Sequence, residues 1–329
     1  MILFKTPKWF EVRGIVSLAL LPLSGLYWLI SVVRRFALKP KVIEGKIVIC
    51  VGNITVGGGG KTPTCLFIGD LLANSGYSVC FLTRGYGRKS KEFIKIRDGD
   101  SPARAGDEPL LLARRAATYV FSKTSDIFEN VEQITEDVII MDDGLQNPRI
   151  TKDISCLVID GSFGFGNGFI FPAGALRQSY RAARRQIDCT IVINGDSLLD
   201  PDVPNFRLAS SVDVSGLDKT KQYIAFSGLA RNQKFFNSLA RAGIDLDQTI
   251  SFPDHYVYKE SDIRRLIALG RGLLTTEKDF VKLRDFKGSQ CIIPISMSLI
   301  VDMPRLCDDL DLKKWLTTKL QNITMQNKK

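Results

Sequence analysis

The chain has 329 residues, which is more than a typical single domain, so we expect two α/β domains with an appendage. Its formal charge of +10 indicates an anionic partner. The basic side chains concentrate beside an apolar N-terminal segment rather than along an aromatic-rich groove, which argues against a nucleic acid. The seven cysteines form no CxxC motif and stand mostly in apolar runs, which argues against a disulfide framework and is typical of buried thiols in a reducing cytoplasm.

The N-terminal segment 14–33 is twenty residues long and carries no charge, which is about enough helix to cross the hydrocarbon core of a bilayer. Residues 1–41, which flank and include it, have a net charge of +6, and Pro22 interrupts it. A single span would place the first basic group outside, against the positive-inside tendency. We therefore expect residues 1–36 to form a membrane-associated helix, which either spans or lies in the cytoplasmic leaflet. A buried helix of a soluble core is the open alternative.

The next stretch, residues 48–64, reads VICVGNITVGGGGKTPT, an apolar run followed by four glycines and a Lys-Thr pair before a helix-like pattern. The backbone N–H groups of such a loop can close around phosphate oxygens, while the helix N-terminus and the lysine add positive charge. The hydroxyl of a threonine after the lysine can bind Mg²⁺. The strict P-loop pattern has glycine at position 55, where this chain has Thr55. We predict a nucleoside triphosphate cradle formed by Thr55, Val56, Gly57, Gly58, Gly59, Gly60, Lys61 and Thr62.

Strand-like and helix-like stretches alternate from residue 46 to about residue 215. The alternation predicts a parallel sheet with right-handed crossovers and a ligand site at the carboxyl ends of its strands. We therefore assign residues 37–215 to a P-loop NTPase-like α/β domain. Its later strands are predicted at residues 77–83, 138–141, 155–160 and 189–194, with a helix over residues 105–121.

The alternating pattern restarts after residue 215, which predicts a second, smaller α/β domain over residues 216–329. A strand, turn and helix are expected over residues 221–244, and a helix over residues 260–270. Residues 272–283 and 289–299 are expected to supply two further strands, and residues 308–320 a closing helix.

Acidic residues stand at two of the predicted strand and helix ends. Asp142 and Asp143 follow the apolar run 138–141, where a Walker B carboxylate belongs and where it can hold Mg²⁺ directly or through water. Acid-glycine sequences also make ordinary turns, which is the alternative. Asp107 and Glu108 open the helix after residue 106, where capping is the commoner use of such acids and catalysis the rarer one.

Two further features have both a structural and a functional interpretation. His255, the only histidine, follows Asp254, and a lone histidine is more often a hydrogen-bonded structural group than a catalyst. The segment 177–185, RQSYRAARR, is either a solvated helix face or a clamp in which Arg177 and its neighbours bind phosphate through planar guanidinium groups.

The motifs together resemble the tetraacyldisaccharide 4′-kinase family, the lipid A 4′-kinases of Gram-negative bacteria. The resemblance covers most of the chain in the family's order, and several motifs are specific to the family rather than to P-loop proteins at large. It rests on the charge-free N-terminal segment and on VGNITVGGGGKTP, LTRGYGR, AGDEPLLLA, DDGLQNP, GNGFIFPAGALRQ, FSGLA, SFPDHY and LLTTEKDFVKL.

The resemblance implies a kinase that transfers the γ-phosphoryl group of ATP to the 4′-hydroxyl of a tetraacyldisaccharide 1-phosphate. It also implies an active site between two α/β domains and an N-terminal helix at the cytoplasmic face of the inner membrane. The residues implicated by position are Lys61 and Thr62 for nucleotide and Mg²⁺, Asp142 and Asp143 for the metal, and Asp107 with His255 for deprotonation of the sugar hydroxyl.

Three sites depart from the family's pattern. Gly59 stands where threonine is common, Asn147 where histidine is common, and Ala175–Gln178 where the family has Pro-Leu-Arg-Glu. Gln178 cannot carry charge, and Asn147 removes a titratable group beside the acidic pair. The P-loop lysine, both acids and the histidine remain, so we expect an active enzyme.

A membrane-bound P-loop nucleotide switch that controls a protein partner is the rival from another class. The sequence shows no obligate protein partner, and the charge distribution disfavours the second rival, a nucleic-acid-dependent ATPase. The rivals differ in whether ATP turnover requires a lipid sugar or a macromolecule.

Overall fold

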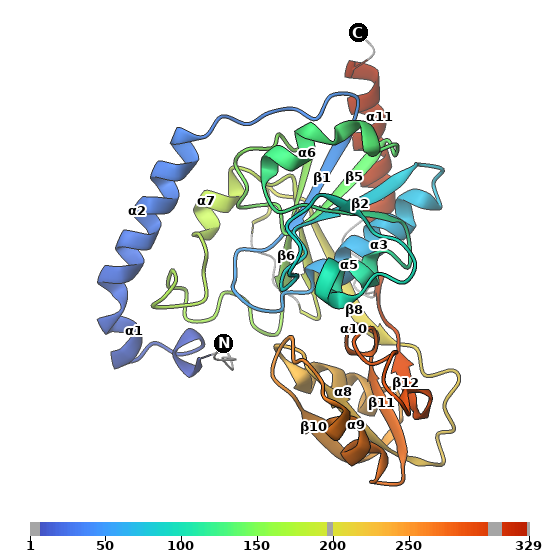
Figure 1. Ribbon diagram of the computed structural model, residues 1–329. Coiled ribbons are helices and arrows are strands. Elements are labelled where there is room, and N and C mark those ends of the chain that lie inside the picture. The colour runs from blue at the N-terminus through green and yellow to red at the C-terminus, as the bar shows by residue number, and fades with distance from the viewer. Residues whose placement is uncertain (1–6, 196–199, 302–310, 328–329) are drawn as a thin grey trace.

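The computed structural model describes residues 7–195, 200–301 and 311–327, which form two β-sheets with helices on their faces (Figure 1). Within these residues the larger sheet has nine strands in the order β13-β8-β7-β6-β1-β5-β2-β4-β3, and the smaller has four in the order β10-β9-β11-β12. Paired strands are parallel except at the edges of the larger sheet, where β13 pairs with β8 and β3 with β4 antiparallel. The predicted α/β fold with a mainly parallel sheet is confirmed.

The central strands of the larger sheet are continuous apolar runs because both faces of the sheet are covered. In β1, Ile49 faces one apolar cluster and Val48 the other, as the two-residue period of a strand requires. The strands are β1 (Ile47–Gly52), β2 (Val79–Thr83), β3 (Ile94–Lys95), β4 (Ala117–Val120), β5 (Val138–Asp142), β6 (Ile154–Asp160), β7 (Cys189–Ile193), β8 (Asn205–Val212) and β13 (Met297–Val301).

Helix α3 (Lys61–Ala73) begins at the end of the glycine loop and packs on this sheet through Cys65, Ile68 and Leu72. The C-terminal helix α11 (Leu312–Asn327) buries its apolar side chains in the same cluster. The other helical segments around the sheet are α4 (Pro102–Ala105), α5 (Asp107–Leu112), α6 (Thr124–Glu129), α7 (Tyr180–Arg184) and the 3-10 turns Lys8–Phe10 and Val131–Gln133.

The smaller sheet lies at the carboxyl edge of the larger one (Figure 1). Separate apolar clusters cover its two faces, one built around Phe235 and the other around Phe226. Its elements are β9 (Gln222–Ser227), α8 (Asn232–Arg241), β10 (Asp245–Ser251), α9 (Glu260–Ile267), β11 (Gly272–Thr276), α10 (Glu277–Phe280), the 3-10 turn Ser289–Cys291 and β12 (Ile292–Ile295).

The smaller sheet ends at Ile295, whereas the predicted second domain continues to residue 329. The apolar run 289–299, predicted as one strand, supplies β12 to the smaller sheet and β13 to the larger one. Apolar composition alone does not tell which sheet a strand joins. The first residues of the predicted closing helix, 308–310, lie outside the described residues, and the remainder forms part of α11 on the larger sheet.

The predicted helix over residues 105–121 is wrong in its second half. The helix α5 ends at Leu112, and Ala117–Val120 forms β4 between β2 and β3. Tyr119 and Val120 are fully buried there, as suits β-branched and aromatic residues of a strand with neighbours on both sides.

The N-terminal segment forms two helices, α1 (Ile15–Ala19) and α2 (Leu21–Ala37), which meet beside Pro22. In a core helix the apolar side chains are buried and the polar ones are exposed, and these two helices show the opposite. Ser24 is buried and hydrogen-bonds to Ile170 O at 2.7 Å and Ala173 N at 3.0 Å, while most of the large apolar side chains are exposed. The alternative of a buried core helix is therefore wrong. Among the described residues, no helix is both long and apolar enough to pass through a membrane.

Candidate active site

The glycine loop after β1 has the backbone of a phosphate cradle. Gly57 and Gly60 have φ of 98° and 79°, a region that favours glycine, and Gly60 caps α3. A Cβ at Gly59 would lie 2.3 Å from Asn53 Nδ2, and one at Gly60 would lie 2.5 Å from Ile193 Cδ1. The glycines therefore let the loop pass close to the ends of β1 and β7.

The residues before the glycines pair with the segment that carries Arg177. Val56 N donates to Ala175 O at 2.8 Å, and Arg177 N donates to Ile54 O at 2.7 Å. A bridge between Thr55 and the segment's Leu176 lies between these bonds. This short pairing brings Arg177 from a distant part of the chain to the cradle.

Two cations converge on Asp143 at the end of β5. Arg177 Nη1 lies 3.0 Å from both carboxylate oxygens, and Lys61 Nζ lies 3.6 Å from Oδ2. Lys61 also donates to Asn53 Oδ1 at 3.3 Å. Burial alone would raise the pKa of Asp143, but Lys61 and Arg177 outweigh it and hold the pKa below its ordinary value.

The neighbouring Asp142 is in the opposite electrostatic situation. Thr62 Oγ1 donates to its Oδ2 at 2.9 Å, while its buried Oδ1 has no hydrogen-bond partner among the described residues. Burial, followed by the negative charge of Glu108, raises the pKa of Asp142 to about 7. A buried carboxylate oxygen without a donor is the group that a bound cation would satisfy.

This donor set fits Mg²⁺. The ion prefers oxygen ligands and is commonly held at nucleotide sites by one or two carboxylates, with phosphates and water completing its shell. Asp142, Asp143 and the Thr62 hydroxyl supply such oxygens at the cradle. Among the described residues, no group of three or more histidine, cysteine or acidic side chains is arranged to hold a metal ion.

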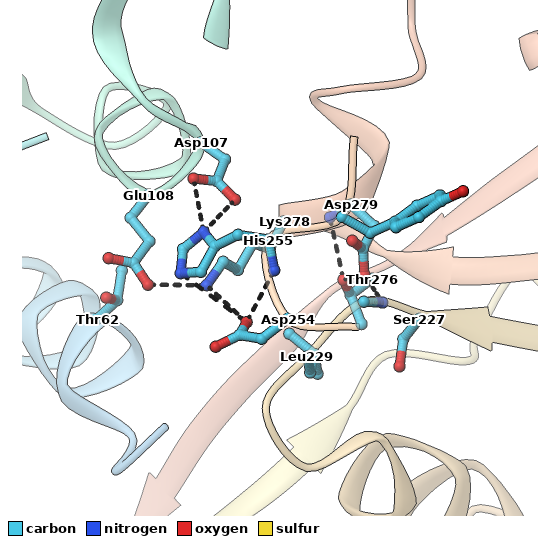
Figure 2. A network of polar contacts seen from close by, with 12 residues as sticks. Thr62, Asp107, Glu108, Ser227, Leu229, Asp254, His255, Thr276, Lys278 and Asp279 are labelled. Atoms are coloured by element: carbon cyan, nitrogen blue, oxygen red, sulfur yellow. Dashed lines mark hydrogen bonds and ion pairs between the residues drawn. The ribbon is translucent and has the colours of Figure 1, made fainter. Parts of the chain in front are cut away.

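The predicted pair of Asp107 and His255 is also assembled (Figure 2). Asp107 is the first residue of α5, and its two oxygens lie 3.2 and 3.1 Å from His255 Nδ1. His255 follows β10 and has φ of 55°, with its backbone N 3.3 Å from Gly228 O. Burial would raise the pKa of Asp107, but the His255 hydrogen bond, Lys278 and Lys282 hold the pKa well below its ordinary range.

Two lysines that the sequence analysis did not single out complete this side of the site. Lys278 Nζ lies 2.8 Å from Glu108 and 4.0 Å from Asp254 (Figure 2). Lys282 Nζ lies 3.5 Å from Asp107. Burial would lower the pKa of Lys278, but the surrounding carboxylates raise it. The sequence does contain one indication of this pair, since the two lysines stand four residues apart and therefore lie on the same face of the helical segment that begins with α10.

Within segment 177–185, Arg184 differs from Arg177 in its contacts. Arg184 pairs with Asp200 and Asp202 at the surface, so the solvated-face interpretation holds for it. Asn147 and Gln178, the two neutral residues that depart from the family's pattern, have hydrogen-bond partners outside the glycine loop. Asn147 Nδ2 donates to Thr124 Oγ1 at 3.2 Å, and Gln178 accepts from Arg35 at 3.3 Å.

A phosphate cradle at the carboxyl edge of a parallel sheet, with a lysine, two acids and an aspartate–histidine pair beside it, defines a P-loop phosphotransferase. The family model described as tetraacyldisaccharide-1-P 4'-kinase matches residues 16–321. The chain belongs to the tetraacyldisaccharide 4′-kinase family.

Individual relatives agree with this assignment. The tetraacyldisaccharide 4'-kinase of Rickettsia conorii is 33% identical over 317 residues, covering 94% of this chain and 98% of the relative. That of Rickettsia felis is 32% identical, covering 94% and 97%. Among solved structures, the "apo" form of LpxK from Aquifex aeolicus in complex with ATP matches with a TM-score of 0.74 and 27% identity, covering 94% of this chain and 99% of that chain.

The contrast between Asp142 and Asp143 predicts opposite effects of charge removal on stability. In the nucleotide- and metal-free protein, the raised pKa means that the fold favours the protonated form of Asp142. The stability that this form gives is lost as the pH rises through about 7. Asp142→Asn should therefore raise the free energy of unfolding at pH 8, by on the order of 2 kcal/mol, and raise it less at pH 5.

Asp143→Asn is the matched control, because the lowered pKa of Asp143 gives stability that is present above the unfolded pKa. This variant should be less stable than wild type at both pH values. Urea unfolding in EDTA measures both differences. Equal destabilisation by the two variants at pH 8 would contradict the assigned environments.

Proposed function

We propose that this chain is an ATP-dependent kinase that transfers the γ-phosphoryl group to the 4′-hydroxyl of a tetraacyldisaccharide 1-phosphate in lipid A biosynthesis. The names of its relatives and the ATP bound by the Aquifex aeolicus protein support the substrates. The observation that carries the chemistry is the Asp107–His255 pair, which joins the two sheets beside the phosphate cradle.

The cradle binds the triphosphate through its backbone N–H groups and its cations. Lys61 and Arg177, both now held by Asp143, are placed to neutralise phosphate charge. The residues proposed for nucleotide binding are Thr55, Val56, Gly57, Gly58, Gly59, Gly60, Lys61, Thr62 and Arg177. Since phosphoryl transfer depends mainly on positioning and charge stabilisation, this set provides most of what the nucleotide side needs.

Thr62, Asp142 and Asp143 are the residues that would hold Mg²⁺. When bound, the ion neutralises phosphate charge and orients the nucleotide. Asp142 contributes the buried Oδ1 oxygen, and the Thr62 hydroxyl, which now donates to Asp142, is free to turn its lone pairs outward.

Asp107 is the proposed general base, and His255 positions it. The sugar hydroxyl loses its proton to the Asp107 carboxylate as the oxygen bonds to phosphorus. The low pKa makes Asp107 a weak base, which is compatible with a loose transition state in which the proton leaves late. His255 lies beside the smaller sheet and Asp107 beside the larger one, so the pair depends on contact between the two parts of the chain.

The test of the kinase assignment is phosphate transfer to the lipid disaccharide by purified protein with ATP and Mg²⁺. Lys61→Ala should reduce transfer by at least about 10²-fold because a cation at the phosphates is lost, while leaving the fold unchanged. Lys313→Ala, on the exposed face of α11, is the control and should behave as wild type. Transfer that is absent in wild type, or ATP turnover that requires a protein instead, would favour the nucleotide switch.

Asp107→Ala and His255→Ala should each lower kcat by about 10²- to 10⁴-fold and change ATP binding little. Their effects should be less than additive in the double variant because the two side chains act as a unit. Single-turnover rates and calorimetric ATP affinities of wild type, the two single variants and the double variant complete this double-mutant cycle. Additive losses in kcat, or losses confined to ATP affinity, would return both residues to structural roles.

We also propose that α1 and α2 bind the cytoplasmic face of the inner membrane, where the acylated substrate resides. Large apolar side chains are concentrated there in exposed positions, far beyond the scattered exposure normal for a soluble surface. Arg34 and Arg35 near the end of α2 suit anionic headgroups. This exposed apolar set comprises Val12, Ile15, Val16, Leu18, Leu21, Leu23, Leu26, Trp28, Leu29, Ile30, Val33 and Phe36.

Changing Leu26, Ile30 and Val33 together to serine should weaken binding to vesicles that contain phosphatidylglycerol on the order of tenfold or more. Transfer to vesicle-embedded substrate should fall, while transfer to detergent-solubilised substrate should persist. The matched control changes three exposed apolar residues elsewhere, Val42, Leu269 and Ile300, to serine. Co-sedimentation measures binding, and an equal loss in both triple variants would refute the assigned surface.

A further inference from the structure

A second charged cluster lies at the cradle and has no role in the chemistry described so far. Asp160, at the end of β6, is only 5% exposed, and its Oδ2 forms ion pairs with both Arg231 and Lys234. The Ser162 hydroxyl donates to its other oxygen at 2.7 Å. The Arg231 guanidinium lies 3.8 Å from the centre of the Phe163 ring. One buried carboxylate is therefore shared by two cations from the smaller sheet's domain.

In this cluster two basic side chains share one carboxylate. Burial lowers the pKa of both Arg231 and Lys234, so each is partly withdrawn from water. Glu11 is the other acid that influences Arg231, and no hydrogen bond or ion pair joins the two in the described part of the chain. Since Arg231 and Lys234 keep 21% and 33% of their side chains exposed, one of them can contact a second anion while the other stays with Asp160.

The cradle is the adjacent anion site. A Cβ built on Gly58 would lie 3.5 Å from the Cβ of Ala230, the residue immediately before Arg231. The strand β1, which leads into the cradle, lies between β5 and β6. Asp142 therefore lies on the β5 side of the cradle, and Asp160 with Arg231 lies on the β6 side.

We infer that Arg231 is a catalytic arginine, which leaves Asp160 when ATP binds and donates to an oxygen of the γ-phosphoryl group. The second cation makes this exchange possible, because Lys234 stays with Asp160 and the buried carboxylate is never left unpaired. A guanidinium fork suits the planar distribution of oxygens on the phosphoryl group during transfer.

The inference rests on the proposed kinase function, in which one bond to the γ-phosphorus forms as another breaks. The acceptor hydroxyl oxygen bonds to the γ-phosphorus, and its proton passes to Asp107. The bond from that phosphorus to the β,γ-bridging oxygen breaks, and ADP carries away the bond's electron pair. Arg231 forms and breaks no covalent bond and stabilises the charge on the γ-phosphoryl oxygens during the transfer.

The competing account is a static latch, in which Arg231 only holds the smaller sheet's domain to Asp160. Arg231→Met and Asp160→Asn separate the two accounts. For a latch, both variants remove the Arg231–Asp160 pair, and Asp160→Asn, which also removes the Lys234–Asp160 pair, should lose at least as much activity as Arg231→Met. For a catalytic arginine, Arg231→Met should lower single-turnover transfer by about 10²-fold or more, whereas Asp160→Asn frees Arg231 and should tighten ATP binding.

The affinities for ATP and ADP test the role of Arg231 without the lipid acceptor. Equilibrium titration with fluorescent ATP and ADP should show that Arg231→Met loses roughly tenfold in ATP affinity and keeps its ADP affinity, since only ATP has the γ-phosphoryl group. The control Arg271→Met removes the exposed Arg271–Asp247 pair, 2.8 Å long, from the same domain and should change neither affinity. Thermal unfolding verifies that each variant is folded.

Equal losses of ATP and ADP affinity in Arg231→Met, or matching losses in Asp160→Asn, would overturn the inference in favour of the latch. Partial recovery of Arg231→Ala by added guanidinium would support it, because a latch would not respond to a free cation. If wild type binds ATP but transfers no phosphate to the lipid, the kinase proposal fails, and the ATP-to-ADP comparison still decides the place of Arg231.

Discussion

The charge pairing between the two sheets is the constraint on which the site depends. Acids beside the larger sheet face basic side chains beside the smaller one at three places: Asp107 with Lys282 and His255, Glu108 with Lys278, and Asp160 with Arg231 and Lys234. Asp107 and Asp160 are buried and Glu108 is half-buried, so these contacts are stronger than fully exposed ion pairs. The arrangement positions a histidine and several cations at a phosphate cradle that the smaller domain does not itself contain.

This polarity also explains how an anionic substrate can enter a site that is already ion-paired. Lys61 and Arg177 both contact Asp143, so a phosphate and a cation can exchange with existing partners rather than with water. Asp142 is the exception, because burial and the negative charge of Glu108 raise its pKa and its Oδ1 has no hydrogen-bond partner among the described residues. The site thus combines cations near the glycine loop with one acid oxygen that lacks a partner, which together fit a metal–triphosphate complex.

Local patterns could be predicted from the sequence, and long-range pairings could not. The glycine loop, the acid pair after β5 and the apolar strands follow from residue type and spacing over a few positions. The pairing of Asp107 with His255 came from family resemblance, because 148 residues separate them. Neither source indicated Lys278 or the Asp160–Arg231 contact, since a lone lysine or arginine in a helix-like pattern is usually solvated.

The departures from the family's pattern lie on contacts that can change without altering the phosphate site. Gln178 accepts a hydrogen bond from Arg35 at the end of α2, so a neutral side chain there loosens an electrostatic tie to the N-terminal helices rather than to the nucleotide. Asn147 bonds to Thr124 at the start of α6, on the other side of the acid pair from the cradle. A Cβ at Gly59 would press on the Asn53 amide, which itself accepts from Lys61, so glycine there leaves this lysine support undisturbed. Lys61, Asp142 and Asp143 keep their charge, and the variation falls where neutral hydrogen bonds can replace ionic ones at little cost in free energy.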